Sequence, residues 1–354
     1  MSDALPTPRR FPLTAGLMAG VGGLLGATAV GWLGLPPNVA LLLSITVGVA
    51  LLAFALGRVM GWSDRWMVIA IPLGWFLVFF LVPFFVLGRI SLSEAIIARP
   101  PYSPLWDTAP DGSIEILASL QNYGFILGES LYRNAYLSSM QVAAVSTVFA
   151  LLIGYPIAYY IARSEEPKRS ILLLMVILPF WTSFLLRVYA WIGFLRREGV
   201  INNLLLWAGI IDEPLVMMQT PGAVYVGIVY TYLPFMILPI YSALEKMDGS
   251  LIEAAEDLGC SRLSAFWLVT FPLSRPGIIA GCFLVFIPAM GEFVIPSLLG
   301  GSQTLMIGKV LWEEFFSNRD WPVASAVAVV LLLLLVVPIV LFQRNQQRQQ
   351  EAGK

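Results

Sequence analysis

The chain carries eight apolar stretches of the length that an α-helix needs to cross a membrane, about 20 residues each. They lie near residues 12–34, 38–57, 67–88, 136–162, 171–194, 221–244, 277–298 and 323–343. Long apolar runs of this kind are typical of membrane-spanning helices. The sequence therefore predicts an all-α fold, a polytopic membrane helical bundle.

The composition agrees with a membrane protein and excludes several other classes. Hydrophobic residues make up 58% of the chain and charged residues 12%, whereas soluble domains average roughly 45–50% and about 25%. The net charge of −1 gives no case for binding nucleic acid. The chain has no His, and its two cysteines, Cys260 and Cys282, are more simply packing residues. We therefore predict no metal site, no disulfide framework and no cofactor.

Basic residues in the short connecting loops predict which side of the membrane each loop occupies. When eight spans are drawn, most Lys and Arg residues fall on one side, which we assign to the cytoplasm. The basic residues on the other side are Arg89, Arg99, Arg133, Arg196, Arg197, Lys309 and Arg319. The first two spans, joined by a very short turn, are expected to form a hairpin with both ends inside.

These assignments divide the chain into three parts. Residues 1–60 form an N-terminal membrane hairpin, residues 61–345 form the main transmembrane domain with a cytoplasmic loop at 246–276, and residues 346–354 form a cytoplasmic tail. Three external segments are long enough to receive a soluble binding protein, or they merely connect the spans. They are residues 89–135, 195–220 and 299–322.

The stretch from Ser250 to Pro272 reads as a helix, a glycine and a second helix between two apolar spans. Ser250 is expected to cap the first helix, with Glu253 completing a capping box. Gly259 is expected to end that helix in the left-handed conformation, and Ser261 to start the next one. Small residues here also allow another protein to approach closely, and we favour this interpretation. The alternative is that Glu253 only caps the helix and that the alanines reflect ordinary helix propensity.

This stretch resembles the coupling-loop signature of permease subunits of bacterial ATP-binding cassette importers. Glu253-Ala254-Ala255 is followed after three residues by Gly259, and after nine more by Val269-Thr270-Phe271-Pro272, with Phe271 where Leu is usual. The resemblance implies that the loop docks on a separate cytoplasmic ATPase dimer. The residues it assigns to this coupling are Glu253, Ala254, Ala255, Asp257 and Gly259.

Longer strings narrow the resemblance to the putrescine/spermidine permease family. It covers about residues 66–345 and rests on LIGYPIAYYIA, LPFWTSFLLRVYAWIG, GIVYTYLPFMILPIYSALEKMD, VFIPAMGEFVIPSLLGG and VLWEEFFSNRDWPVASA. It implies a bacterial inner-membrane importer built from two different permeases, two ATPase copies and a periplasmic polyamine-binding protein. That family core has six spans, so the hairpin at 1–60 is an addition. Putrescine is the favoured cargo, with spermidine or another organic cation as the alternative.

The chain is expected to be a transport subunit and not an enzyme. It has no G-x-x-x-x-G-K-[ST] phosphate loop, so ATP hydrolysis must come from a partner. A secondary transporter also places a carboxylate among broken helices, but it should show repeated halves, and none is visible here.

Glu292 stands out because an ionised carboxylate at the centre of a bilayer costs on the order of 2.5–3.5 kcal/mol. Gly291, Pro288 and Pro296 should kink its span and free carbonyl groups toward a cavity. Arg187 is expected at a similar depth in its own span. Two interpretations stay open: the two charges form a structural pair, or Glu292 meets a polyamine with Arg187 as its resting counter-ion.

Aromatic side chains near these charges could offer π faces to ammonium groups. Trp181, in mid-span, is expected to line a cavity, whereas Tyr189, Trp191 and Tyr225 are better explained as an aromatic belt at the membrane surface. The residues predicted for the substrate pathway are Glu292, Trp181, Arg187 and Tyr232.

Overall fold

The computed structural model describes residues 72–108, 114–301 and 304–352, together with residues 48 and 69. The chain divides into two compact units, Met1–Arg89 and Ile90–Lys354. Apart from residues 48 and 69, the described part of the first unit belongs to one apolar helix, Pro72–Ser91, whose last two residues lie in the second unit. This helix contains the π-helical turn η1 (Leu77–Leu81) and continues as α4 (Val82–Ser91). This helix confirms the span predicted at 67–88. The two spans predicted at 12–34 and 38–57 lie outside the described residues.

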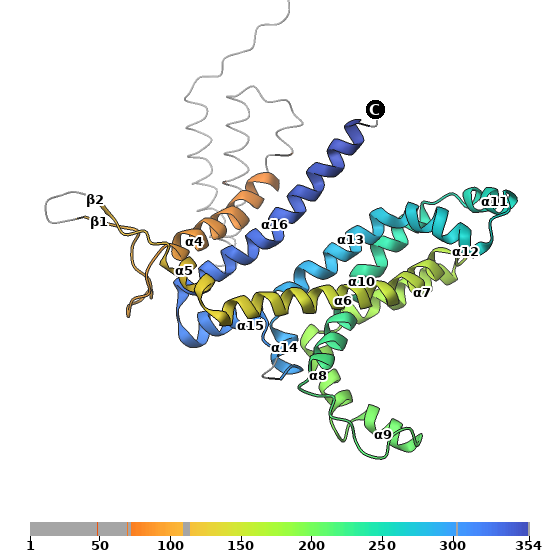
Figure 1. The fold of residues 1–354 in the computed structure, drawn as a ribbon, viewed down its shortest axis with the longest axis horizontal. Coiled ribbons are helices and arrows are strands. Elements are labelled where there is room, and N and C mark those ends of the chain that lie inside the picture. The colour runs from red at the N-terminus through yellow and green to blue at the C-terminus, as the bar shows by residue number, and fades with distance from the viewer. Residues whose placement is uncertain (1–47, 49–68, 70–71, 109–113, 302–303, 353–354) are drawn as a thin grey trace, which may run out of the picture. The chain divides into compact units, whose positions relative to one another are not determined.

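The second unit is almost entirely helical (Figure 1). Its longer helices are α5 (Gln121–Gly128), α6 (Ser130–Ala162), α7 (Lys168–Ile177), α8 (Phe184–Leu195), α9 (Val200–Trp207), α10 (Pro221–Glu245), α11 (Ser250–Asp257), α13 (Phe271–Met290) and α16 (Trp321–Ala352). Its shorter helical elements are η2 (Leu178–Trp181), α12 (Arg262–Ala265), η3 (Phe266–Thr270), α14 (Val294–Leu298), α15 (Ile307–Trp312) and η4 (Glu313–Asn318). The predicted membrane helical bundle is thereby confirmed.

One external segment departs from the all-α expectation. Strands β1 (Trp106–Thr108) and β2 (Ile114–Ile116) pair antiparallel, with Trp106 opposite Ile116. The segment predicted as a loop at 89–135 also contains α5 and the first turn of α6. The prediction missed these elements because only the long apolar runs were used to place helices.

Two predicted spans are interrupted in the structure. The stretch at 171–194 is bent by 93° between a helix that ends at Trp181 and one that begins at Phe184. Thr182 and Ser183 take extended backbone there, and the Thr182 hydroxyl donates to the Pro179 carbonyl at 2.7 Å. The stretch at 277–298 is helical from Arg262 as far as Met290 and then breaks. The break at Gly291 was predicted; the sharp bend at residues 182–183 was not.

Helices α6, α10 and α13 run side by side and form the centre of the second unit (Figure 1). The start of α10 is stabilised by a helix cap. The Thr220 hydroxyl oxygen accepts the Ala223 N–H at 3.2 Å, and Pro221 occupies the first turn. Close approach of α13 to α10 depends on Gly277, where an added Cβ would overlap the Pro239 carbonyl oxygen and the Ala243 Cβ.

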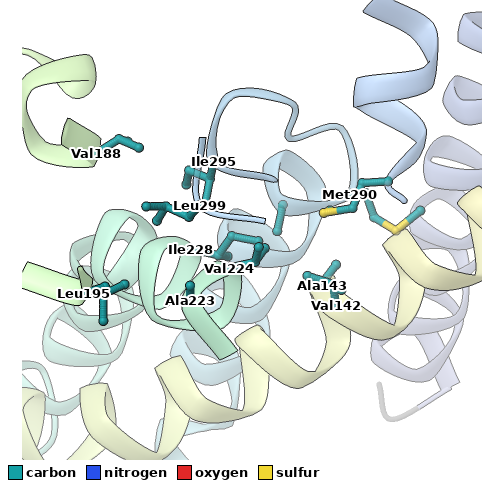
Figure 2. Packing of buried hydrophobic residues seen from close by; sticks show 12 residues of the cluster. Val142, Ala143, Val188, Leu195, Ala223, Val224, Ile228, Met290, Ile295 and Leu299 are labelled. Carbon is teal, nitrogen blue, oxygen red and sulfur yellow. The ribbon is translucent and has the colours of Figure 1, made fainter. Parts of the chain in front are cut away.

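A buried apolar cluster joins the outer ends of these helices to the broken segments, as Figure 2 shows. Val142 and Ala143 come from α6, Val224 and Ile228 from α10, and Ile295 from α14. Burial of this cluster holds the short helix α14 against the long ones. It thereby fixes the backbone on either side of Glu292.

We predict that Gly277→Ala destabilises the protein, because its new methyl group meets backbone atoms of α10 that have no room to move. The expected cost is about 1–3 kcal/mol, measured as a lower midpoint of thermal unfolding in detergent. The matched control is Gly193→Ala in α8, where nothing lies within 4 Å of an added Cβ. Equal midpoints for the two variants would contradict the close packing of α13 on α10.

Candidate functional site

The break at the outer end of α13 creates the most unusual feature of the described chain. α13 ends at Met290, Gly291 to Phe293 are not helical, and α14 begins at Val294. Gly308 of α15 packs directly on this break, because a Cβ there would overlap the carbonyl oxygens of Gly291 and Glu292. The break is therefore covered by protein, which is the condition under which irregular backbone is tolerated inside a membrane.

Glu292 is 7% exposed, and its carboxylate is held by three donors. Oε2 accepts the hydroxyl of Tyr232 at 2.5 Å. Oε1 accepts the backbone N–H groups of Val294 at 3.1 Å and Ile295 at 3.4 Å, and so caps the first turn of α14. A carboxylate offers about four acceptor positions. One position is therefore left for a further donor.

Glu292 lines a pocket of about 530 Å³ between three spans. Its walls come from the bent span of η2 and α8, from the middle of α10, and from the break after α13. The lining residues are Phe180, Phe184, Arg187, Thr231, Tyr232, Phe235, Pro288, Gly291, Glu292, Phe293 and Val294. Aromatic rings thus surround a single buried carboxylate.

Arg187 enters the same pocket from α8. Its guanidinium carbon lies 5.0 Å from the ring centre of Phe180 and 6.0 Å from that of Phe184. Its Nε is buried and has no hydrogen-bond partner. The ion pairs between described residues are Arg169 with Glu245 and Arg262 with Glu256, so Arg187 and Glu292 share a pocket without pairing within 4.0 Å.

The structure separates the four residues predicted for the substrate pathway. Tyr232, Arg187 and Glu292 line one pocket, whereas Trp181 is 77% exposed and lies outside its lining. The sequence analysis missed the rings of Phe180, Phe184 and Phe235. The first two are four residues apart, but the intervening bend removes the helical spacing that would have linked them to one face.

The hairpin at 246–276 is built as predicted at its turn. Gly259 adopts φ +88°, and two hydrogen bonds close the end of α11, from Gly259 N–H to Glu256 O and from Cys260 N–H to Ala255 O. This pattern is a Schellman motif. Ser261 then caps α12 by accepting the Ser264 N–H at 3.2 Å.

The predicted capping box at Ser250 is wrong. Ser250 is already inside α11, and its N–H donates to the Asp248 carboxylate at 3.0 Å. Asp248 therefore provides the acidic group at the start of the helix, and hydrogen bonding from Ser250 lowers the pKa of Asp248. In the turn Met247-Asp248-Gly249, the Asp248 carboxylate reaches forward to the backbone N–H two residues later. Glu253 therefore has no capping role.

The five residues predicted for coupling lie on the outside of this hairpin. Ala255 is half-buried, and the others are exposed, namely Glu253, Ala254, Asp257 and Gly259. Two leucines that the sequence analysis did not single out are also exposed beside them, Leu258 at 86% and Leu263 at 70%. Apolar side chains this exposed next to small residues indicate a surface for another protein.

Comparison with known proteins shows to which protein family the chain belongs. The model of the family of binding-protein-dependent transport system inner membrane components matches residues 21–349. The chain belongs to this family. It is a transport component and a multi-pass protein of the inner membrane, as the sequence predicted.

The relatives confirm the resemblance to the putrescine/spermidine permeases. The spermidine/putrescine transport system permease protein PotB of Escherichia coli (strain K12) is 44% identical over 223 residues, which cover 63% of this chain and 81% of the relative. PotB of Haemophilus influenzae is 39% identical over 263 residues, covering 74% of this chain and 86% of the relative.

Solved structures support the fold. A bacterial ABC transporter involved in the import of the acidic polysaccharide alginate matches with a TM-score of 0.60 and 17% identity, over 80% of this chain and 96% of that chain. A bacterial alginate ABC transporter in complex with an alginate pentasaccharide-bound periplasmic protein matches with the same TM-score of 0.60. At this identity the likeness shows the fold alone.

We predict that Tyr232→Phe destabilises the protein by about 1–3 kcal/mol, because the buried carboxylate of Glu292 loses a donor. The measurement is the thermal unfolding midpoint of the purified chain. The control is Tyr230→Phe, since Tyr230 lies on the same helix, is 37% exposed and makes no side-chain hydrogen bond to a described residue. An unchanged midpoint for Tyr232→Phe would show that the hydrogen bond contributes nothing.

Proposed function

We propose that this chain is a permease subunit of an ATP-driven polyamine importer, with putrescine as its cargo. It forms half of the translocation pathway with a second permease and is coupled to a cytoplasmic ATPase dimer. A periplasmic polyamine-binding protein delivers the substrate. The observation that carries the proposal is the buried, aromatic-walled carboxylate at Glu292, in a chain that is 44% identical to spermidine/putrescine permeases.

The pocket suits an aliphatic chain with ammonium groups. The free acceptor position of Glu292 receives one ammonium N–H, and ring faces attract cations while also contacting methylene groups. The volume of about 530 Å³ lies within the usual range for small-molecule sites. Of the described lining residues, only Arg187 and Glu292 carry a full charge, so the site recognises charge at one carboxylate only.

The hairpin at 246–276 is the element that we propose contacts the ATPase. α11 is exposed along most of its length and ends in a rigid glycine turn. From Arg262 the chain then continues as one helix to Met290, two residues before Glu292. Movement of the hairpin is therefore passed to the break without an intervening loop.

We predict that Glu292→Gln lowers polyamine uptake at least tenfold but lowers assembly much less, because the amide oxygen can still accept the N–H groups of α14. Adding Arg187→Gln should not restore uptake. Uptake is measured per assembled complex, with assembly judged by co-purification of the second permease and the ATPase.

The double variant separates the two roles of Glu292. If the carboxylate only balances the charge of Arg187, removal of both charges should return uptake to the wild-type level. Full recovery in the double variant would therefore remove Glu292 from the substrate pathway. Its role would then be structural.

For the hairpin, we predict that Gly259→Ala weakens co-purification of the ATPase and lowers uptake. A side chain at φ +88° costs about 1–2 kcal/mol, which distorts the turn. Gly249→Ala is the matched control, since Gly249 has φ −61° and, like Gly259, has nothing within 4 Å of an added Cβ. The same loss in both variants, or in neither, would argue against the turn as the coupling element.

A further inference from the structure

The position of Arg187 is unusual for a cation beside a buried carboxylate. Its guanidinium rests against Phe180 and Phe184, yet it shares the pocket with Glu292. A structural ion pair would bring the two groups within hydrogen-bond distance, because an unpaired buried charge is costly. In this structure no such pair forms. Something other than direct pairing therefore accounts for a cation at this place.

Each charge is held by a separate set of partners. The carboxylate of Glu292 is fixed by Tyr232 and by two backbone N–H groups of α14. The guanidinium of Arg187 is supported by ring faces on its own bent span, and its Nε has no hydrogen-bond partner. The guanidinium is therefore the less constrained of the two. It remains available to move when the pocket is occupied.

The two charges make the formal charge of the described pocket lining zero. Without Arg187 the pocket would present one buried carboxylate surrounded by aromatic rings, an arrangement that binds cations tightly. Conduction and transport require sites that bind well enough to admit the substrate but weakly enough to release it. A second cation fixed nearby weakens cation binding through repulsion, and this repulsion is strong where water is scarce.

We propose that Arg187 is a tethered cation that prevents the Glu292 pocket from trapping its substrate. It occupies the aromatic faces of Phe180 and Phe184 at rest and repels an ammonium group that reaches Glu292, so the bound polyamine leaves readily. The substrate is a linear aliphatic diamine or triamine. This inference rests on the proposed function and adds a residue that controls release.

The test compares binding and transport, because the inference expects them to change in opposite directions. The importer, containing this chain, the second permease and the ATPase dimer, is placed in lipid nanodiscs without binding protein or nucleotide. Equilibrium binding of radiolabelled putrescine is measured there. Maximal import is measured in proteoliposomes with the binding protein and ATP.

The neutral variants Arg187→Gln and Arg187→Met should bind putrescine about tenfold more tightly or better, since removal of a nearby like charge favours the bound cation. Both should import it several-fold more slowly. Arg187→Lys keeps the charge and a cation–π contact, so it should stay close to the wild type in both measurements. The control Arg197→Gln, which removes an exposed charge outside the pocket, should leave binding unchanged.

Unchanged or weaker binding in the neutral variants would overturn the inference. Equal tightening in Arg197→Gln would also overturn it, since the effect would then come from general surface charge. Failure of both neutral variants to assemble would show that the guanidinium is needed for the fold and would likewise overturn it. If the wild-type importer takes up no polyamine, the proposed function itself fails, which is a separate result.

Discussion

The hydrogen bonds between the Glu292 carboxylate and the start of α14 are the interactions on which the outer half of the described structure depends. A helix that begins inside a membrane leaves the backbone N–H groups of its first turn without partners, and lipid supplies none. Glu292 accepts two of these groups, and Tyr232 ties the same carboxylate to α10. The carboxylate that we propose binds a cation is thus also the group that makes the break in the span tolerable.

Around that carboxylate, small residues and rings decide the shape of the pocket. Gly308 brings α15 onto the break, and four residues later Trp312 stacks on Phe293 at 4.5 Å between ring centres. The ring centre of Trp312 in turn lies 4.1 Å from the ring centre of Phe316. Of these three rings, Phe293 lines the pocket. The packing that supports the break therefore also holds one ring of the pocket wall in place.

Much of this arrangement could be predicted from the sequence because it depends on local rules. The long apolar helices, the left-handed Gly259, the cap at Ser261 and the break at Gly291 each follow from residues close together in the chain. The proximity of Arg187 to Glu292 was expected from matching depths, but their separation was not. Whether two side chains at one depth face each other depends on helix rotation and bending, which the spacing of residues does not record.

The missed features depend on longer-range geometry or on a choice between similar local partners. The ring centres of Phe180 and Phe235 lie 5.2 Å apart only because the span predicted at 171–194 bends sharply. Asp248 took over the capping role expected of Ser250, because its carboxylate accepts the Ser250 N–H and Ser250 is then inside α11. Both side chains are good helix caps, so propensity alone does not choose between them.

The unbroken helix from Arg262 to Met290 has a mechanical consequence. Its 29 residues span about 43 Å at about 1.5 Å per residue, with the hairpin at one end and the break at the other (Figure 1). Such a rod acts as a lever, because a tilt of about 5° at the hairpin moves its far end by about 4 Å. A displacement of that size is larger than the length of a hydrogen bond. If the rod turns rigidly while α10 stays in place, a small rotation at the hairpin end is enough to break the hydrogen bond between Glu292 and Tyr232.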